Sequence, residues 1–407
     1  MANLIVVISL VATAALLLSP RLTSSPVWRA TVTPLASIIG SGFLVSLPLL
    51  VHDLGLYAVA GMTFLVVFSY LLGGAIRFNI LNGEPLFAEG GSGWVGWLET
   101  LSHLALALAY FISVTYYLTL LAAFLLRGIG VSHVLAGRVL TTAILAGIGL
   151  QGLFRGLRGL ETIEEYAVGL KLAVIAAVLA ALAWLNLDRA LAGTWHLPQL
   201  EASIGWRSIR TVLGLLIVVQ GFETSRFLAG AYPPELRVRT MRYAQILSGA
   251  IYIAFFLLAM VALNEREVMS TDVTGIVALL RPVASLLPLA IIGGAIFAQL
   301  SAAVADAIGA GGLIEDVSRK RVDHRHAYPV IALIGIALTW SLDVFGVIAL
   351  ASRAFALFYL LQCLVAVGVA MTAPGVKQRA LLVAGFLALA LLALAVVIFG
   401  APVAGAG

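Results

Sequence analysis

The stretch Ile38-Ile-Gly-Ser-Gly-Phe43 lies near the middle of a long apolar segment, residues 27–50. Two glycines around a serine weaken a helix and leave backbone amides and carbonyls without helical partners. Inside a membrane such groups persist only where they line a cavity or are buried in protein. The stretch therefore predicts either a broken membrane helix, whose second half presents its amides to an anion, or a small-residue face for close helix packing.

The composition around this stretch requires lipid as the solvent of the fold. Of the 407 residues, 62% are hydrophobic and 11% are charged, and the mean hydropathy is +1.09. A soluble domain has about 45–50% apolar and about 25% charged residues. The apolar runs are continuous and do not alternate, which disfavours membrane strands. We therefore expect an all-α polytopic membrane protein, in which the single Cys363 excludes an intramolecular disulfide framework.

The length accommodates about twelve spans, since a spanning helix needs roughly 20 apolar residues. The first run lacks the positive charges that precede the core of a secretory signal, and we interpret it as a helix with its N-terminus outside. Several runs exceed one straight crossing, which predicts tilts, kinks or interfacial turns. The expected spans are residues 2–19, 27–50, 54–76, 94–126, 134–154, 164–186, 209–231, 240–263, 283–313, 327–348, 350–372 and 378–400.

Basic loops that set the membrane topology account for the net charge of +5, and no nucleic-acid partner is expected. When the 24 Lys and Arg residues are assigned to alternate loops, fourteen lie on one side, seven on the other and three inside spans. The richer side is predicted to be cytoplasmic. It holds the basic segment 318–326, which is either a solvated loop or a surface for anionic lipid.

A second interrupted segment reads Val219-Gln-Gly-Phe-Glu-Thr-Ser-Arg226. Gln220, Glu223 and Arg226 would lie near one face of a continuous helix. Polar groups inside a span usually face a water-filled cavity or each other. The segment therefore predicts a hinge at Gly221 or a buried ion pair between Glu223 and Arg226. Five spans separate the starts of the two interrupted segments, the layout expected of two inverted five-helix halves.

Two further ionisable residues lie inside spans. Lys171 is placed about two turns into its span, so its ammonium either extends to the cytoplasmic surface or occupies an internal polar site. In the internal site it could act as a fixed cation or a proton carrier. Asp306, with Gln299 and Ser301 nearby, should face the interior and is a candidate partner of Lys171.

Other patterns indicate no chemistry. Gly91-Ser-Gly-Trp-Val-Gly96 has the form GxGxxG, but it follows no strand, so nucleotide binding is not expected. The six histidines are scattered and indicate no metal site. No acid–base or nucleophilic constellation can be identified at one membrane depth. We therefore expect neither an enzyme nor a cofactor.

Three short stretches resemble amino-acid permeases of the amino acid–polyamine–organocation (APC) superfamily. Ile39-Gly-Ser-Gly-Phe43 is similar to the Ile-Gly-Ser-Gly-Ile/Val-Phe signature of their first core helix. Val219-Gln-Gly-Phe-Glu223, with Pro234-Glu-Leu-Arg237 and Arg239-Thr-Met-Arg242 after it, resembles their sixth-helix pattern. Glu161 to Lys171 is similar to the approach to their fifth helix, where a lysine recurs. The resemblance extends from about residue 27 to 372.

The resemblance implies a leucine-transporter-like fold of two inverted five-helix repeats. The implied organisation is an extra N-terminal helix in residues 1–26, repeats in 27–190 and 200–372, and a C-terminal helix in 373–407. It also implies that the first break holds a substrate carboxylate and the second meets the amino group. The implied substrate-binding residues are Ile39, Gly40, Ser41, Gly42, Gln220, Gly221, Phe222, Glu223 and Arg226.

The resemblance further implies how transport is coupled. In relatives with the fifth-helix lysine, the ammonium stands where sodium sits in sodium-coupled relatives, so Lys171 favours proton coupling or exchange. Sodium-site relatives carry adjacent hydroxyl residues on the eighth core helix, whereas Ser301 is followed by Ala302 here. The candidate coupling residues are Lys171, Ser301 and Asp306.

Two departures from the family pattern concern the substrate. The paired acids that usually follow the sixth helix are replaced by Gly230-Ala-Tyr-Pro-Pro. Arg226 is unusual at this depth: facing the cavity it would favour an acidic substrate, whereas paired with Glu223 it would indicate nothing about the substrate.

Together these features predict a secondary transporter that moves amino acids or related small amines by alternating access in the inner membrane of a prokaryotic cell. The alternative is a membrane sensor with the same fold that binds a solute without moving it. The sequence indicates neither the particular substrate nor the oligomeric state.

Overall fold

The computed structural model describes residues 1–40, 42–88, 93–131, 133–157, 161–200, 204–263 and 272–401, with the side chains of 161–166 excepted. Every regular element in these ranges is a helix, as predicted from the sequence. The longer elements are α1 (Ala2–Leu17), α3 (Pro26–Ile38), α4 (Gly42–Leu54), α5 (Ala58–Phe78), α7 (Gly93–Gly128), α8 (Val134–Arg155), α9 (Glu161–Leu191), α11 (Pro234–Ala259), α14 (Leu287–Val317), α15 (Ala327–Ser341), α16 (Val344–Thr372) and α17 (Arg379–Phe399). The shorter ones are α2 (Pro20–Thr23), η1 (Gly55–Tyr57), η2 (Asn79–Gly83), α6 (Glu84–Ala88), α10 (Trp206–Gly214), η4 (Leu216–Val219), η5 (Phe222–Leu228), η6 (Met260–Ala262), α13 (Gly275–Leu280) and η7 (His324–His326).

Eight helical segments in the described part of the chain are long and apolar enough to cross a membrane. One of them is the run Pro26–Ala88, which contains two of the predicted spans, 27–50 and 54–76. Three other predicted spans are shorter or interrupted: α1 has 16 residues, α15 has 15, and the span 209–231 is divided among α10, η4 and η5. The chain is therefore a polytopic helical membrane protein. By length and composition alone, its described residues contain eight candidate spans, where the sequence predicts about twelve.

The helix starts follow the local sequence. Pro26 opens α3, and the Ser25 hydroxyl accepts a hydrogen bond from the Trp28 amide at 3.4 Å. Asp343 precedes α16, and its carboxylate accepts from the Gly346 amide at 2.7 Å. Proline lacks an amide hydrogen, and short polar side chains satisfy the free amides of a first turn, so both residue types favour these positions.

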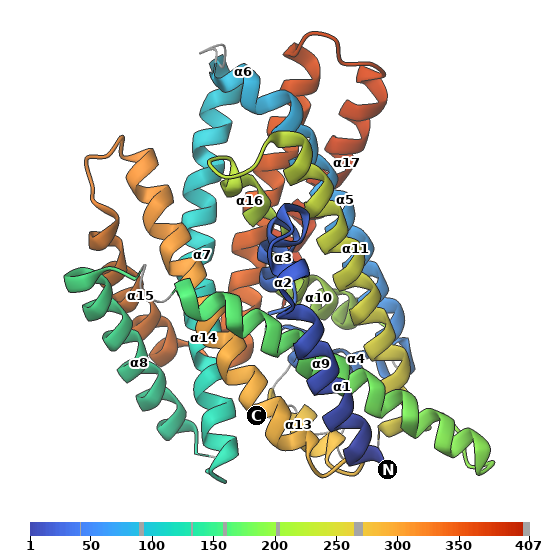
Figure 1. The fold of residues 1–407 in the computed structure, drawn as a ribbon. Helices are drawn as coiled ribbons and strands as arrows, with labels where there is room; N and C mark the ends of the chain where they lie inside the picture. Colours follow the sequence, from blue (N-terminus) through green and yellow to red (C-terminus); the bar gives the residue numbers. More distant parts are fainter. Residues whose placement is uncertain are drawn as a thin grey trace.

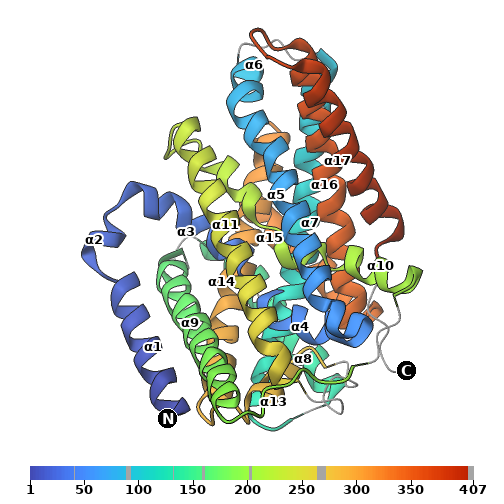
Figure 2. The ribbon, with the colours of Figure 1, turned by 90° about the vertical axis from the view of Figure 1, so that its right-hand side faces the viewer.

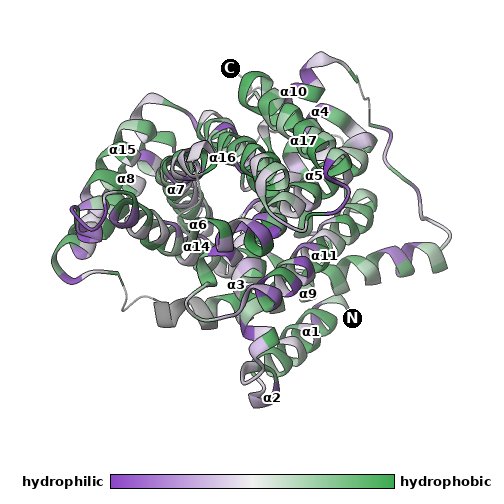
Figure 3. Ribbon diagram, turned by 90° about the horizontal axis from the view of Figure 1, so that it is seen from above, coloured by the Kyte–Doolittle hydropathy of each residue, from purple (hydrophilic) through white to green (hydrophobic). Residues whose placement is uncertain are grey.

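The long helix α7 runs from the upper to the lower end of the bundle (Figures 1 and 2). It packs against α8, α14, α15 and α16, while α11 packs against α3, α5 and α9. Helix α1 lies at the periphery, where it contacts α9. Seen from above, outer helices such as α1 and α17 are largely hydrophobic, and hydrophilic segments lie near the middle beside α6 and α14 (Figure 3).

The connections alternate between the two ends of the bundle. In Figure 1 the α14–α15 connection, the α16–α17 connection and α6 lie toward the upper end, while the N-terminus, α13 and the α7–α8 connection lie toward the lower end. The basic segment 318–326 belongs to the upper end. Since this segment belongs to the side that is richer in Lys and Arg, the upper end is the one predicted to be cytoplasmic.

Candidate functional site

The first helix break separates α3 from α4. Helix α3 ends at Ile38, Ile39 has φ −85° and ψ 53°, and α4 begins at Gly42. Ser41 lies outside the described residues. A Cβ atom on Gly42 would lie 2.6 Å from the Val218 Cα, so only glycine fits at this approach. The break is thus a close contact with the second interrupted segment as well as a gap in a helix.

The second break separates η4 from η5. Gln220 is extended, and Gly221 has φ +115°, a left-handed conformation that favours glycine. A Cβ atom on Gly221 would lie 2.6 Å from the Ser37 carbonyl carbon. Each break therefore packs against the helix end at the other break. Both interpretations of the glycine motifs therefore apply: the glycines lie at helix breaks, and they also allow the two segments to pack closely.

Buried side chains satisfy the backbone groups that the breaks release. The Tyr252 hydroxyl lies 2.6 Å from the Val218 carbonyl oxygen and 3.2 Å from that of Ile38, so it joins the ends of both first half-helices. Ser69 donates to the Val219 carbonyl at 2.9 Å. The Ser352 hydroxyl accepts from the Ile217 amide at 3.0 Å. Such partners are required because water does not reach these groups.

Unpartnered acceptor atoms gather at the second break. Glu223 Oε2 accepts from the Gly221 amide at 3.0 Å and from the Tyr359 hydroxyl at 2.8 Å. Gln220 Nε2 donates to the Tyr117 hydroxyl at 2.9 Å. Glu223 Oε1 and Gln220 Oε1 are buried and make no hydrogen bond among the described residues. A buried carboxylate oxygen and an amide oxygen without donors can both accept from a ligand ammonium.

Aromatic rings flank these acceptors. The Phe222 ring stacks on Tyr359 with 5.0 Å between centroids, and both residues are buried. The Tyr110 ring lies edge-on to that of Phe355, with 6.0 Å between the centroids. Phe355 precedes Tyr359 by one turn of α16. Glu223 is fully buried and accepts from Tyr359, and in such low-dielectric surroundings a carboxylate attracts a cation more strongly than in water.

Lys171 is buried, with 5% of its surface exposed, and its ammonium donates to the Ala36 carbonyl at 2.5 Å. Ala36 lies in the last turn of α3, where free carbonyls and the helix dipole attract a cation. The ammonium therefore occupies an internal polar site beside the first break and does not extend to the membrane surface.

The other two predicted coupling residues lie on α14 and are also buried. The Asp306 carboxylate accepts a short hydrogen bond from the Ser113 hydroxyl of α7. Ser301 has 7% of its surface exposed. The contacts described for Asp306 and for Lys171 run to different helices, α7 and α3.

Arg226 makes a different pair from the one considered at the sequence level. Its guanidinium contacts the Glu99 carboxylate of α7 at 2.5 Å, and its Nη1 donates to Gln362 Oε1 at 2.6 Å. The suggested Glu223–Arg226 pair is wrong, because the Glu223 carboxylate turns back to the Gly221 amide, which the break leaves without a helical acceptor. The assumed continuous helix is interrupted at Gly221.

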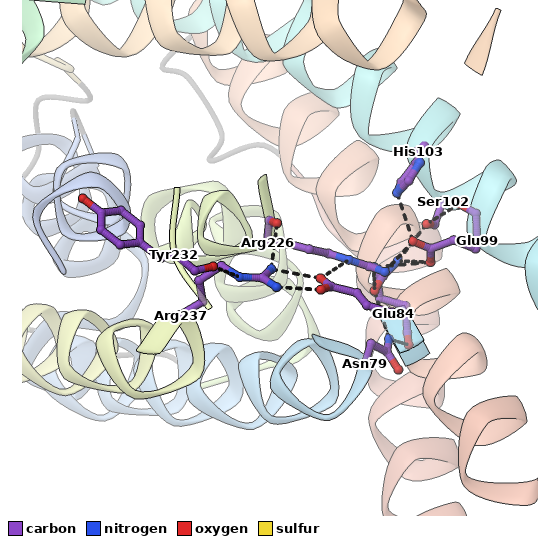
Figure 4. A network of polar contacts seen from close by, with 9 residues as sticks. Asn79, Glu84, Glu99, Ser102, His103, Arg226, Tyr232 and Arg237 are labelled. Atoms are coloured by element: carbon purple, nitrogen blue, oxygen red, sulfur yellow. Dashed lines mark hydrogen bonds and ion pairs between the residues drawn. The ribbon is translucent and has the colours of Figure 1, made fainter. Parts of the chain in front are cut away.

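The Glu99–Arg226 pair belongs to a larger charged network (Figure 4), to which α6, at the upper end of the bundle in Figure 1, contributes Glu84. A second guanidinium, that of Arg237, contacts Glu84 at 2.6 and 3.0 Å and donates to the Arg226 carbonyl at 3.0 Å. Gln362 Nε2 donates to Glu99 at 3.0 Å. The network joins α6, α7, η5, α11 and α16, and its two carboxylates balance its two guanidiniums. We call Glu84, Glu99, Arg226, Arg237 and Gln362 the charged network.

Sequence reasoning missed Glu84, Glu99 and Gln362. Glu99 could have been found, because it is an acid inside the predicted span 94–126, with His103 one turn later and 3.0 Å from its carboxylate. Gln362 has no such signal, since an isolated glutamine in an apolar run identifies no partner.

A bundle of long apolar helices with two broken helices at its centre defines an integral, multi-pass membrane protein. The chain matches a family of APC superfamily transporters over residues 20–400, and it belongs to that family. A membrane location and a small-molecule substrate follow from this membership. The resemblance seen in three short stretches is thus confirmed over almost the whole chain.

A protein of Aquifex aeolicus (strain VF5), described as an uncharacterized protein, is 44% identical over 354 residues. The match covers 86% of this chain and 86% of that protein. The two proteins are therefore similar over most of the length of each.

Proposed function

We propose that this protein is a secondary transporter that moves amino acids or related small amines by alternating access. The observation that carries the proposal is the pair of facing helix breaks with unpartnered buried acceptor atoms, Gln220 Oε1 and Glu223 Oε1, at one of them. Without a ligand, each of these unsatisfied groups would lower the free energy of unfolding by about 1–3 kcal/mol.

The proposed substrate site lies between the two breaks. Backbone amides at Gly40, Ser41 and Gly42 are assigned to the substrate carboxylate, because the start of α4 presents free amides and a positive dipole end, whereas the Ile39 amide donates to the Leu35 carbonyl at 2.9 Å and Ile39 only adjoins this site. The ammonium is assigned to the acceptors of Gln220 and Glu223 and to the backbone around Gly221 and Phe222. This assignment of donors to one break and acceptors to the other suits a zwitterion.

Arg226 has another role in this proposal. Its guanidinium is bound by Glu99 and Gln362, so its charge does not call for an acidic substrate. We assign it instead to closing the path between the substrate site and the upper end of the bundle. That end is the predicted cytoplasmic side, because it carries the basic segment 318–326. The charged network must separate when that path opens.

The two broken helices support the proposed repeat organisation. In the leucine-transporter-like arrangement, α3–α4 and α10–η5 are the first helices of the two inverted halves. The halves then comprise residues 27–190 and 200–372, with α1 before them and α17 after them. Broken helices at equivalent places of two halves mark the site at the midplane in such folds.

We propose that coupling uses protons or exchange, with sodium disfavoured. Lys171 carries a buried charge against the end of α3, where a bound cation would otherwise neutralise the free carbonyls. Asp306 and Ser301 are the further candidates on α14. We propose no other cofactor.

Uptake into proteoliposomes tests the proposal. The purified chain is reconstituted, an inward proton gradient is imposed in sodium-free buffer, and a labelled mixture of the common amino acids is added. We expect saturable accumulation that an uncoupler abolishes. Accumulation that requires sodium would refute the coupling part, and ligand-induced thermal stabilisation without any flux would show a sensor in place of a transporter.

A further inference from the structure

Gln299 in α14 is the one described buried glutamine whose whole amide group lacks partners. It is completely buried, and neither Oε1 nor Nε2 makes a hydrogen bond among the described residues. The other buried glutamines there all make at least one bond: Gln220 to Tyr117, Gln245 to Ser69 and Gln362 to Glu99. An amide with a free donor and a free acceptor inside a membrane protein indicates a bound polar molecule.

The space for such a molecule is next to the amide. Gln299 lines a cavity of about 20 Å³ together with Gly40 of the first break, Phe43 of α4, Lys171 of α9 and Gly294 of α14. A volume near 10–15 Å³ already accommodates one water molecule, so the cavity is large enough for one water and too small for an amino acid. Lys171 is the charged residue among those that line it.

The chemistry of the lining selects the occupant. The Gln299 amide offers one acceptor and donors, and an ammonium offers donors alone. A sodium ion would be repelled by the ammonium of Lys171, and a chloride ion would place its charge beside the Gln299 carbonyl oxygen. A water molecule can donate to that oxygen and accept from either nitrogen, and therefore satisfies the whole set.

We propose that this cavity is a water site, held by the Gln299 amide, through which Lys171 exchanges its proton. An N–H bond of the ammonium breaks and an O–H bond forms on the water, which passes one of its own protons to solvent when alternating access opens the proposed substrate site at Gly40. The reverse sequence reprotonates the amine, and no electron transfer is involved. Gln299 is in this sense a positioning residue, and the inference rests on the proposed proton-coupled transport.

The test replaces Gln299 with methionine, which has a similar length and no strong donor or acceptor. Three quantities are measured in proteoliposomes with the labelled amino-acid mixture: counterflow exchange at equal pH, accumulation driven by a proton gradient, and substrate-induced proton entry reported by a trapped pH dye. We expect exchange within about twofold of the wild type and accumulation and proton entry reduced about tenfold or more, as for loss of a proton-transfer group.

Two further variants serve as controls. Gln299→Asn keeps an amide in the cavity and should restore part of the accumulation. Gln151→Met lies on the exposed face of α8 and should behave as the wild type. Exchange requires a folded protein that binds substrate. A variant that keeps exchange but loses accumulation has therefore lost coupling alone.

The outcomes separate this inference from the proposed function. A wild type without exchange or accumulation refutes the transporter proposal itself. A wild type that accumulates substrate, with Gln299→Met accumulating equally, overturns the water site alone. Loss of exchange together with accumulation in Gln299→Met overturns it too, because Gln299 would then act in substrate binding or folding.

Discussion

Removal of the Arg226 charge should open the path between the substrate site and the upper end. Arg226 is 7% exposed, and its guanidinium contacts Glu99 at 2.5 Å and Gln362 at 2.6 Å. Breaking a buried ion pair by removing one partner costs about 3–5 kcal/mol, since the other charge stays buried. In Arg226→Met the remaining Glu99 charge is relieved when the path opens and water enters.

The magnitude follows from that cost. If about 2–3 kcal/mol of it differs between the closed and open states, the open fraction rises about 30–150-fold, since each 1.4 kcal/mol changes an equilibrium about tenfold. The assay uses Ser225→Cys as a reporter, because Ser225 is buried in η5 between the break and Arg226. The background is Cys363→Ala, which removes the single native cysteine.

The measured quantity is the rate at which a membrane-impermeant maleimide labels the reporter thiol from the cytoplasmic side. We expect the rate to rise by about the same 30–150-fold factor in Arg226→Met, and the effects of Arg226→Met and Glu99→Gln to be non-additive because the residues are in contact. Arg379→Met, an exposed arginine at the same end, is the matched control and should leave the rate unchanged. A labelling rate within about twofold of the parent in Arg226→Met would refute the closing role of the pair.

Three further substitutions test the site between the breaks. Gly221→Ala should lower the stability by about 2–4 kcal/mol, because its Cβ would lie 2.6 Å from the Ser37 carbonyl carbon at a φ of +115°; a thermal midpoint equal to that of Gly385→Ala, where the Cβ meets open space, would contradict this. Glu223→Gln should weaken binding of the transported amino acid about 10-fold or more, as expected for a lost charged hydrogen bond, and an unchanged KM for uptake would exclude the ammonium assignment. Lys171→Ala should abolish accumulation driven by a proton gradient and spare counterflow exchange, whereas full accumulation would remove its coupling role.

The helical class could be predicted from the sequence, and both glycine motifs marked where a break was one of two interpretations, because glycines that interrupt an apolar run weaken a membrane helix at that point. Gly221 illustrates this: its left-handed φ is one that glycine adopts readily. The number of spans was harder to predict, because hydropathy does not distinguish a continuous span from a segment such as 209–231 that divides into three short helices.

The partners of the charged residues could not be predicted, because they come from helices distant in sequence. Arg226 and Glu99 are 127 positions apart, so the spacing that suggested Glu223 as the partner of Arg226 carried no information about α7. The contact between Lys171 and Ala36 spans 135 positions and depends on how α9 packs beside α3. Family resemblance implied an internal position for the Lys171 ammonium, which the residue pattern alone left open.

Gly42→Val is the decisive variant for the proposed passage of substrate between the two helix breaks. The Cβ of this valine alone would lie 2.6 Å from the Val218 Cα. The side chain would therefore occupy the place where the two broken helices meet and where we propose that substrate binds. We predict saturable, proton-driven uptake of labelled amino acids by the wild type and by Gly385→Val, and none by Gly42→Val at equal amounts of reconstituted protein. Uptake by Gly42→Val with wild-type affinity and rate would show that substrate does not pass between the breaks.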